Sequence, residues 1–178
     1  MTSVGVMALR MRRPLLAAGA ALLALTLATA CSPTPAPTPS PTGFASEEEA
    51  FAAAEATYRA YVDALNARRL NRDSMPSPTD FLTGAALAAE IESEQNFAQL
   101  GRSLVGVTSI HSVRNISAAD ESAEIGVCLD ASHTRVIDED GVDVTPPDRP
   151  NLLGLLIDVV WTPTQPYISS TSASDEQC

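Results

Sequence analysis

The hydrophobic period of this chain changes once, near residue 104, and that change limits the folds open to it. Before it, Phe51, Ala54, Tyr58 and Val62 recur at the spacing of one helix face. From Leu104 onward, apolar and polar residues alternate, which is the pattern of half-buried strands. Helices followed by an antiparallel sheet predict an α+β fold.

The helical part divides into two segments. The first is predicted over 47–67, where Ser46 and Glu49 form a capping box. The second is predicted over 84–100, and Gly101 is placed to end it. A loop containing two prolines separates them.

Several strands follow. Residues 104–116 and 122–131 predict an antiparallel hairpin, and Asp138 to Gly141 predicts a tight turn between 134–137 and 142–144. The apolar run 152–161 predicts a strand that is buried on both faces. With 178 residues, the chain has room for one such domain and an appendage.

The appendage is N-terminal and has the composition of an export signal. Arg10, Arg12 and Arg13 precede an uncharged run over 15–30. That run is short for a transmembrane helix, which needs about 20 residues. We therefore expect residues 1–30 to be a signal peptide that is removed.

The residues at the end of this run resemble the lipobox of bacterial lipoproteins. They read Ala28-Thr29-Ala30-Cys31, with Ala28 where leucine is commoner. The resemblance implies that Cys31 is lipidated and anchors the chain to the outer face of the cell membrane. The alternatives are cleavage after Ala30 without lipidation, which gives a secreted protein, and an uncleaved signal anchor.

Residues 31–43 are predicted to be a linker. Prolines occupy every second position from Pro33 to Pro41, which favours an extended polyproline II chain. At about 3.1 Å per residue, such a spacer reaches roughly 35 to 40 Å. A docking site for a proline-binding domain, or O-glycosylation of its threonines, are the alternatives. The domain is then 44–178.

Charge argues against nucleic acid as a partner. The chain has 11 arginines, no lysine and 22 acidic residues, for a net charge of −11. Removal of the signal takes three arginines, which leaves 8 against 22, or −14. Because an anionic membrane repels such a domain, the lipid must hold it there.

Two cysteines remain besides Cys31. In an exported protein, Cys128 and Cys178 predict one disulfide, which closes a loop of about 50 residues and stabilises by about 4 kcal/mol in the chain-entropy model. The alternative is a buried free Cys128 and a frayed C-terminus. A catalytic thiol has no support, because neither histidine has a suitable neighbour.

Few residues suggest chemistry. Asp130, Ser132 and His133 lie together in sequence, but neighbouring strand residues point to opposite faces, so polar residues at a strand end explain them. His111 is a candidate general base that we expect at the surface. We predict no catalytic residue.

No cofactor or metal site is predicted either. Asp138, Asp140 and Asp143 around Gly141 lack the third acid before the glycine and the late glutamate of a calcium loop. The sequence also has no phosphate-binding loop, nucleophile elbow or zinc-ligand spacing.

The domain resembles the nuclear transport factor 2-like fold. The resemblance rests on the Tyr58/Tyr61 pair in a long first helix, Phe81-Leu82-Thr83-Gly84 before the second, Val127 to Ser132 in the meander, and Trp161. It implies that the sheet curves around the helices as a cone whose open end can be a pocket. Versions with a lipobox and a terminal cysteine resemble a group of lipoproteins of high-GC Gram-positive bacteria.

That superfamily contains isomerases, cyclases, dehydratases and members that only bind or assemble, so the fold does not choose the function. We expect a non-catalytic envelope lipoprotein that binds a small apolar ligand or a partner protein. The alternatives are a pocket enzyme using His111, Asp130 or Asp158, and an assembly module that dimerises through its sheet. A cone filled by Phe51, Tyr58 and Trp161 favours the structural role.

Overall fold

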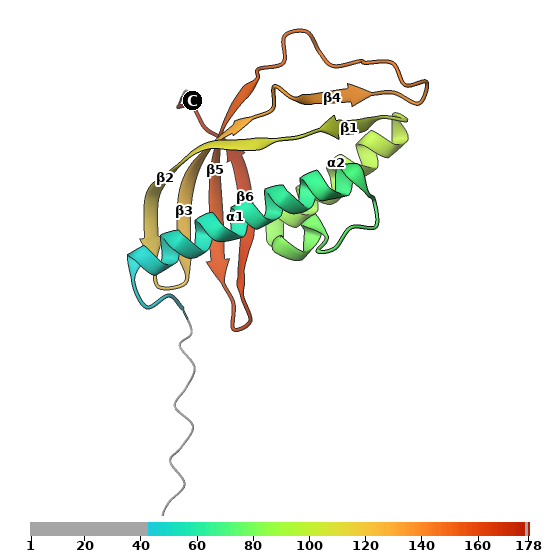
Figure 1. The fold of residues 1–178 in the computed structure, drawn as a ribbon. Coiled ribbons are helices and arrows are strands. Elements are labelled where there is room, and N and C mark those ends of the chain that lie inside the picture. Colours follow the sequence, from blue (N-terminus) through green and yellow to red (C-terminus); the bar gives the residue numbers. More distant parts are fainter. Residues whose placement is uncertain (1–42, 177) are drawn as a thin grey trace, which may run out of the picture. The chain divides into compact units, whose positions relative to one another are not determined.

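The structure is a computed structural model that describes residues 43–176 and residue 178. The predicted signal peptide, Cys31 and the linker through residue 42 lie outside these residues. Two helices and a short 3-10 turn precede six strands (Figure 1): α1 (Glu47–Leu70), η1 (Pro78–Phe81), α2 (Gly84–Gln99), β1 (Ser103–Gly106), β2 (Ser109–Ala119), β3 (Ser122–Asp130), β4 (Thr134–Ile137), β5 (Leu152–Trp161) and β6 (Pro166–Ala173). The predicted α+β class is confirmed, with two helices packed on antiparallel sheets.

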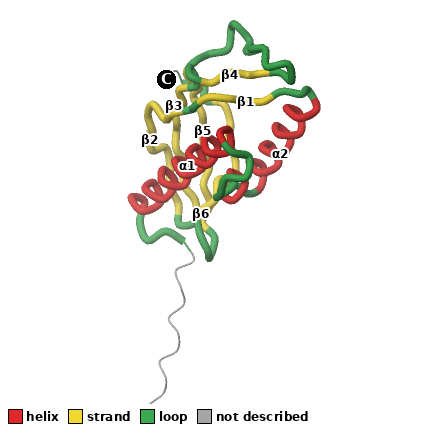
Figure 2. The backbone as a smooth tube through the Cα atoms, turned by 45° about the vertical axis from the view of Figure 1, so that its right-hand side comes forward, coloured by secondary structure: helices red, strands yellow, loops and turns green. Residues whose placement is uncertain are grey.

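The strands form two sheets (Figure 2). The larger has the order β2-β3-β5-β6, and the smaller pairs β1 with β4; all neighbours are antiparallel. The predicted 122–131 strand is β3, and the predicted 152–161 strand is β5, which lies between β3 and β6. The central position of β5 agrees with its apolar sequence.

The prediction of one strand over 104–116 is wrong, because this segment forms two strands that belong to different sheets. Residues 103–106 pair with β4, and the strand that pairs with β3 begins only at Ser109. Gly106 has φ +87°, and the backbone oxygen of His133 fills the place where its Cβ would be. A close approach of two backbones therefore ends the first strand, and the alternation of side chains carries no sign of it.

β6 has no counterpart among the strands predicted from the sequence. Half of its eight residues are serine or threonine, and Ile168 is its fully buried apolar residue. Pairing with β5 orders it. On its other side Ile168 forms a bridge with Leu82, and its carbonyl accepts the Thr83 N–H at 2.8 Å.

The predicted helix boundaries hold to within a few residues. Ser46 caps α1 through its hydroxyl, which accepts the Glu49 N–H at 3.1 Å, although the Glu49 carboxylate reaches the Ala45 N–H instead of that of Ser46. Gly101, with φ +60°, follows α2. The Asp138 to Gly141 turn is also present, closed by a bond from Gly141 N–H to the Asp138 carbonyl at 3.1 Å.

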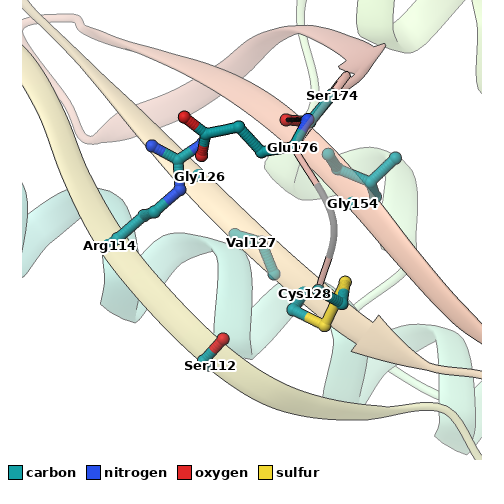
Figure 3. A pocket seen from close by; sticks show the side chains of 10 residues that line it. Ser112, Arg114, Gly126, Val127, Cys128, Gly154, Ser174 and Glu176 are labelled. Carbon is teal, nitrogen blue, oxygen red and sulfur yellow. Dashed lines mark hydrogen bonds and ion pairs between the residues drawn. A yellow bond between two sulfur atoms is a disulfide. The ribbon is translucent and has the colours of Figure 1, made fainter.

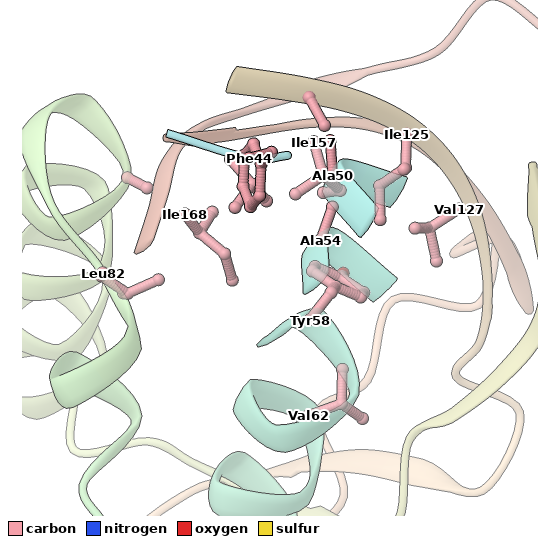
Figure 4. Close-up of a cluster of buried hydrophobic side chains, with 13 residues drawn as sticks. Phe44, Ala50, Ala54, Tyr58, Val62, Leu82, Ile125, Val127, Ile157 and Ile168 are labelled. Atoms are coloured by element: carbon pink, nitrogen blue, oxygen red, sulfur yellow. The ribbon is translucent and has the colours of Figure 1, made fainter. Parts of the chain in front are cut away.

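The core lies between α1 and one face of the larger sheet, which we call the inner face and define by Ile125, Val127, Ile157, Val159 and Ile168 (Figure 4). Alternate residues of each strand point to it. From α1, Ala50, Ala54 and Tyr58 pack against it, and all three are buried. The small alanines let the helix approach the sheet closely.

The opposite, outer face is defined by Gly126, Cys128, Gly154, Leu156 and Asp158. The prediction that β5 is buried on both faces is wrong here. Ile157 and Val159 are fully buried, but Leu156 and Asp158 are half-buried and Leu152 is 40% exposed. Helices cover one face of the sheet, whereas a short C-terminal segment crosses the other.

Candidate functional site

Aromatic side chains fill the space between α1 and the inner face. Tyr58 is 2% exposed, and the half-buried Phe51 and Trp161 pack against the same core. The ring of Trp161 lies 5.1 Å from that of Phe44, measured between centroids. Tyr58 therefore lies in the core, and Phe51 and Trp161 pack against it as partly buried residues.

A polar cluster joins α1 to α2. The Tyr61 hydroxyl donates to the Glu90 carboxylate at 3.1 Å, and both side chains are half-buried. Burial is the main cause that raises the pKa of Glu90. Burial also raises the pKa of Tyr61, and the nearby Glu90 carboxylate raises it further. Burial therefore disfavours the charged form of both groups.

The same cluster extends to the end of α1. Arg69 donates to the Thr108 hydroxyl at 2.8 Å and to the Asn66 side chain at 3.0 Å, and burial lowers its pKa. The Asn66 amide accepts from the Thr108 N–H at 3.0 Å and donates to the Thr108 carbonyl at 2.8 Å. α1 is thereby fixed to the chain between β1 and β2.

A structural role between the helices explains this cluster better than a catalytic role does. A carboxylate with a raised pKa suits a general base. Glu90, however, already accepts a hydrogen bond from Tyr61, and an ion pair from Arg68 to Glu94 at 3.0 Å joins the same two helices. We interpret the cluster as a polar bridge between α1 and α2.

A shallow pocket of 160 Å³ lies on the outer face of the larger sheet (Figure 3). β2, β3, β5 and the C-terminal segment line it, through Ser112, Arg114, Gly126, Val127, Cys128, Gly154, Leu155, Ser174, Glu176 and Cys178. It lies on the side of the sheet away from α1.

The C-terminal segment, which the structure describes at residues 174–176 and 178, is fixed to this face at three points. A disulfide joins Cys178 to Cys128 in β3, at the pair of positions that the cysteine count indicates. Glu176 forms an ion pair with Arg114 of β2. The Ser174 N–H donates to the Gly154 carbonyl at 2.9 Å. The segment therefore crosses three of the four strands.

Two glycines make room for these contacts. A Cβ at Gly154 would lie 2.7 Å from the backbone oxygen of Glu176, and one at Gly126 would lie 2.6 Å from Nε of Arg114. Both distances are shorter than van der Waals contact. Arg114, Gly126, Gly154 and Glu176 were not predicted from the sequence. The two glycines inside alternating strands were the signal that could have indicated a close approach there.

The residues considered for acid–base chemistry are not brought together in the interior. His111 is exposed on β2. Asp158 lies on the outer face, where its carboxylate accepts a hydrogen bond from Ser170, so it does not point into the interior as a pocket enzyme would require. Asp130 is at the end of β3, and hydrogen bonds from Ser132, with the N–H at 2.8 Å, lower its pKa.

The strand also does not continue through Ser132 and His133 as the sequence analysis allowed. β3 ends at Asp130, and the chain turns there before β4. The Asp130 carboxylate caps this turn, so its role is local. Asp138 does the same in the next turn, since it accepts the Val142 N–H at 2.8 Å.

Within residues 43–176 and 178, no group of three or more histidine, cysteine, aspartate or glutamate side chains could hold a metal ion. None of the described helices has the length and apolar character needed to cross a membrane.

The chain matches no protein-family model and no curated protein sequence. Among solved structures it is similar to the intermembrane space region of the chloroplast protein ARC6, at 17% identity and a TM-score of 0.41. The match covers 67% of this chain and 96% of that one.

Proposed function

We propose that this chain is a lipoprotein of the high-GC Gram-positive type, cleaved before Cys31 and anchored to the outer face of the cell membrane through a lipid on that cysteine. Its domain, over 44–178, is a nuclear transport factor 2-like module that binds a partner protein without catalysis. The signal-like residues 1–30, the cysteine directly after them and the proline-rich linker support the anchor.

The aromatic packing between α1 and the sheet is the observation that supports a partner protein over an enclosed ligand. Phe44, Phe51, Tyr58 and Trp161 occupy the space between α1 and the sheet. A small apolar ligand or a substrate needs an open cavity there. A partner protein needs only an exposed surface. The packing of the interior therefore favours a partner protein over a small ligand.

The disulfide supports the extracytoplasmic location. Bonds of this kind persist in oxidising compartments and are rare where thiols are kept reduced. Cys128 and Cys178 are 50 residues apart in sequence, and their bond fixes the end of the chain to the sheet.

The start of the domain fits a tether that keeps it off the membrane. The Phe44 N–H donates to the Asp120 carbonyl at 2.7 Å, so the chain enters beside the turn between β2 and β3. Glu47, Glu48 and Glu121 are exposed at this end. An anionic membrane repels these carboxylates, and the linker gives them distance.

Metabolic labelling of the full chain tests this proposal. The chain is expressed in a high-GC Gram-positive host with an alkyne fatty acid, and the membrane fraction is compared with that of the Cys31→Ser variant. We expect the wild type to carry label and to sediment with membranes, and the variant to carry none. An unlabelled wild-type chain in the medium would contradict the anchor.

A further inference from the structure

The two helices are buried to very different extents. Of its 16 residues, α2 buries Ala86 alone, and Ile91 in its middle is 43% exposed. In α1, the buried residues are Ala50, Ala54, Thr57, Tyr58, Val62 and Ala64. A segment with few buried apolar contacts opens at a lower free energy than the core beside it. α2 is therefore held in place more weakly than α1.

The start of α2 is fixed to the larger sheet. Leu82, just before the helix, is buried and forms a bridge with Ile168 of β6. The Thr83 N–H donates to the Ile168 carbonyl at 2.8 Å. Ala86 follows in the first turn of α2 and is buried. Backbone pairing and buried side chains thus hold this end of the helix.

The rest of α2 reaches α1 through side chains, and the bonds between them are polar. Glu90 accepts a hydrogen bond from the Tyr61 hydroxyl at 3.1 Å, and Glu94 pairs with Arg68 at 3.0 Å. The Arg68 and Glu94 side chains are 34% and 39% exposed. An ion pair so accessible to water contributes little to stability. The last turns of α2 are therefore easier to separate from α1 than its first turn is from β6.

A glycine in the left-handed region lies at each end of α2. Gly84, the first residue of the helix, has φ +53°, and Gly101, just after its last turn, has φ +60°. Glycine adopts such backbone angles without a steric penalty and passes readily to others. Residues at the ends of an element absorb the rotation when that element moves as a body. Both ends of α2 can therefore act as pivots.

We propose that α2 is a hinged helix. Leu82 and Thr83 stay on β6, while the last turns of α2 swing away from α1 by rotation about Gly84 and Gly101. The swing breaks the two polar contacts and uncovers Tyr61, which packs on the core as a partly buried residue. Apolar surface beside the core thereby becomes accessible to solvent without unfolding of α1 or the sheet. The hinge depends neither on the lipid anchor nor on a partner protein.

Distances between two spin labels test the hinge. The full chain carries the labels on non-natural amino acids, which leaves the native cysteines intact. One pair joins Ala56 of α1 to Ala98 in the last turn of α2, and the control pair joins Ala56 to Ala85, beside the first pivot. All three residues are exposed. We expect two distances for the first pair, one of them longer than in the closed structure, and a single distance for the control pair.

Removal of both polar contacts provides a second measurement. Tyr61→Phe combined with Glu94→Gln should raise the population of the longer distance at least threefold. Glu92→Gln is the matched control, because Glu92 is exposed on the same helix, and it should leave the distances unchanged. An intact disulfide on a non-reducing gel shows that the variants are folded. One narrow distance from position 98 in the wild type and the double variant, equal broadening of both label pairs, or an equal effect of Glu92→Gln would overturn the proposal.

Discussion

The inner and outer faces of the four-stranded sheet belong to the same strands but are stabilised by different means. The inner face carries Ile125, Ile157 and Ile168, each 0% exposed, and α1 lies over it. The outer face carries two glycines and a cysteine, and the last residues of the chain cross it. A helix packs on the inner face. The outer face is covered by the C-terminal segment, which a disulfide and an ion pair fix in place.

This difference shows how a small domain can order a polar C-terminus. The segment over 174–178 contains no apolar residue besides its cysteine, so burial contributes little to its position. A disulfide can take the place of a second hydrophobic layer. The account predicts that variants of the two faces behave differently.

The largest effect is expected on the inner face. Ile157→Ala should lower the free energy of unfolding by about 2 to 5 kcal/mol, because it removes buried contacts and leaves a cavity. Leu156→Ala is the matched control, since Leu156 is the next residue of β5 and is half-buried on the outer face. Chemical denaturation of both variants measures the difference. Equal losses would contradict the assignment of the two faces.

The next effect concerns the disulfide. Cys178→Ser should lower the free energy of unfolding by about 2 to 4 kcal/mol, because the unfolded chain gains freedom when its 50-residue loop opens. Cys178 is exposed, so the substitution removes little packing. Denaturation of the wild type with reductant is the control, and it should show the same loss. An unchanged midpoint in both would show that the bond does not form.

A smaller effect is expected where the segment approaches the sheet. Gly154→Ala places a methyl group against the Glu176 backbone and should cost about 1 to 3 kcal/mol. Gly141→Ala is a control of another kind: Gly141 has φ +79° but open space around it, so any loss there comes from backbone strain. Hydrogen exchange of residues 174–178 should accelerate in Gly154→Ala and stay unchanged in Gly141→Ala. Equal protection of this segment in the two variants would contradict the close approach.

The smallest effect lies away from both faces, in the bridge between α1 and α2. Burial raises the pKa of Glu90 above its ordinary value of 4.5, so the folded state binds the proton more tightly than the unfolded state. Its contribution to stability is therefore complete below pH 4.5 and is lost as pH rises through the folded-state pKa. As pH rises from 4.5 through the folded-state pKa, the free energy of unfolding of Glu90→Gln should increase relative to that of the wild type. Denaturation at several pH values measures this, and a constant difference would contradict the shift.

Local patterns predicted most of the secondary structure, because they are recorded in neighbouring residues. The capping serine, Gly101 and the Asp138 to Gly141 turn all act within a few positions. The break after Gly106 and the strand β6 depend on residues far away in sequence, namely His133 and Leu82. No spacing rule reports such contacts, so both were missed.

The candidate site was predicted less well than the fold. The cysteine pair could be inferred from composition and compartment, without geometry. Arg114 and Glu176 could not, since an ion pair across 62 positions has no sequence pattern. The suggested bases failed for the opposite reason. They are reactive types of residue, but His111 is exposed, Asp130 lies at the end of β3 and Asp158 lies on the outer face, so none of them enters the core.

The intact mass of the chain extracted from membranes of a high-GC Gram-positive host tests the central claim most directly. The account predicts a chain that begins at Cys31, carries a diacylglycerol-sized addition on that residue and is two hydrogens lighter than the reduced form. A mass equal to the full 178 residues, or to residues 31–178 without lipid, would contradict it.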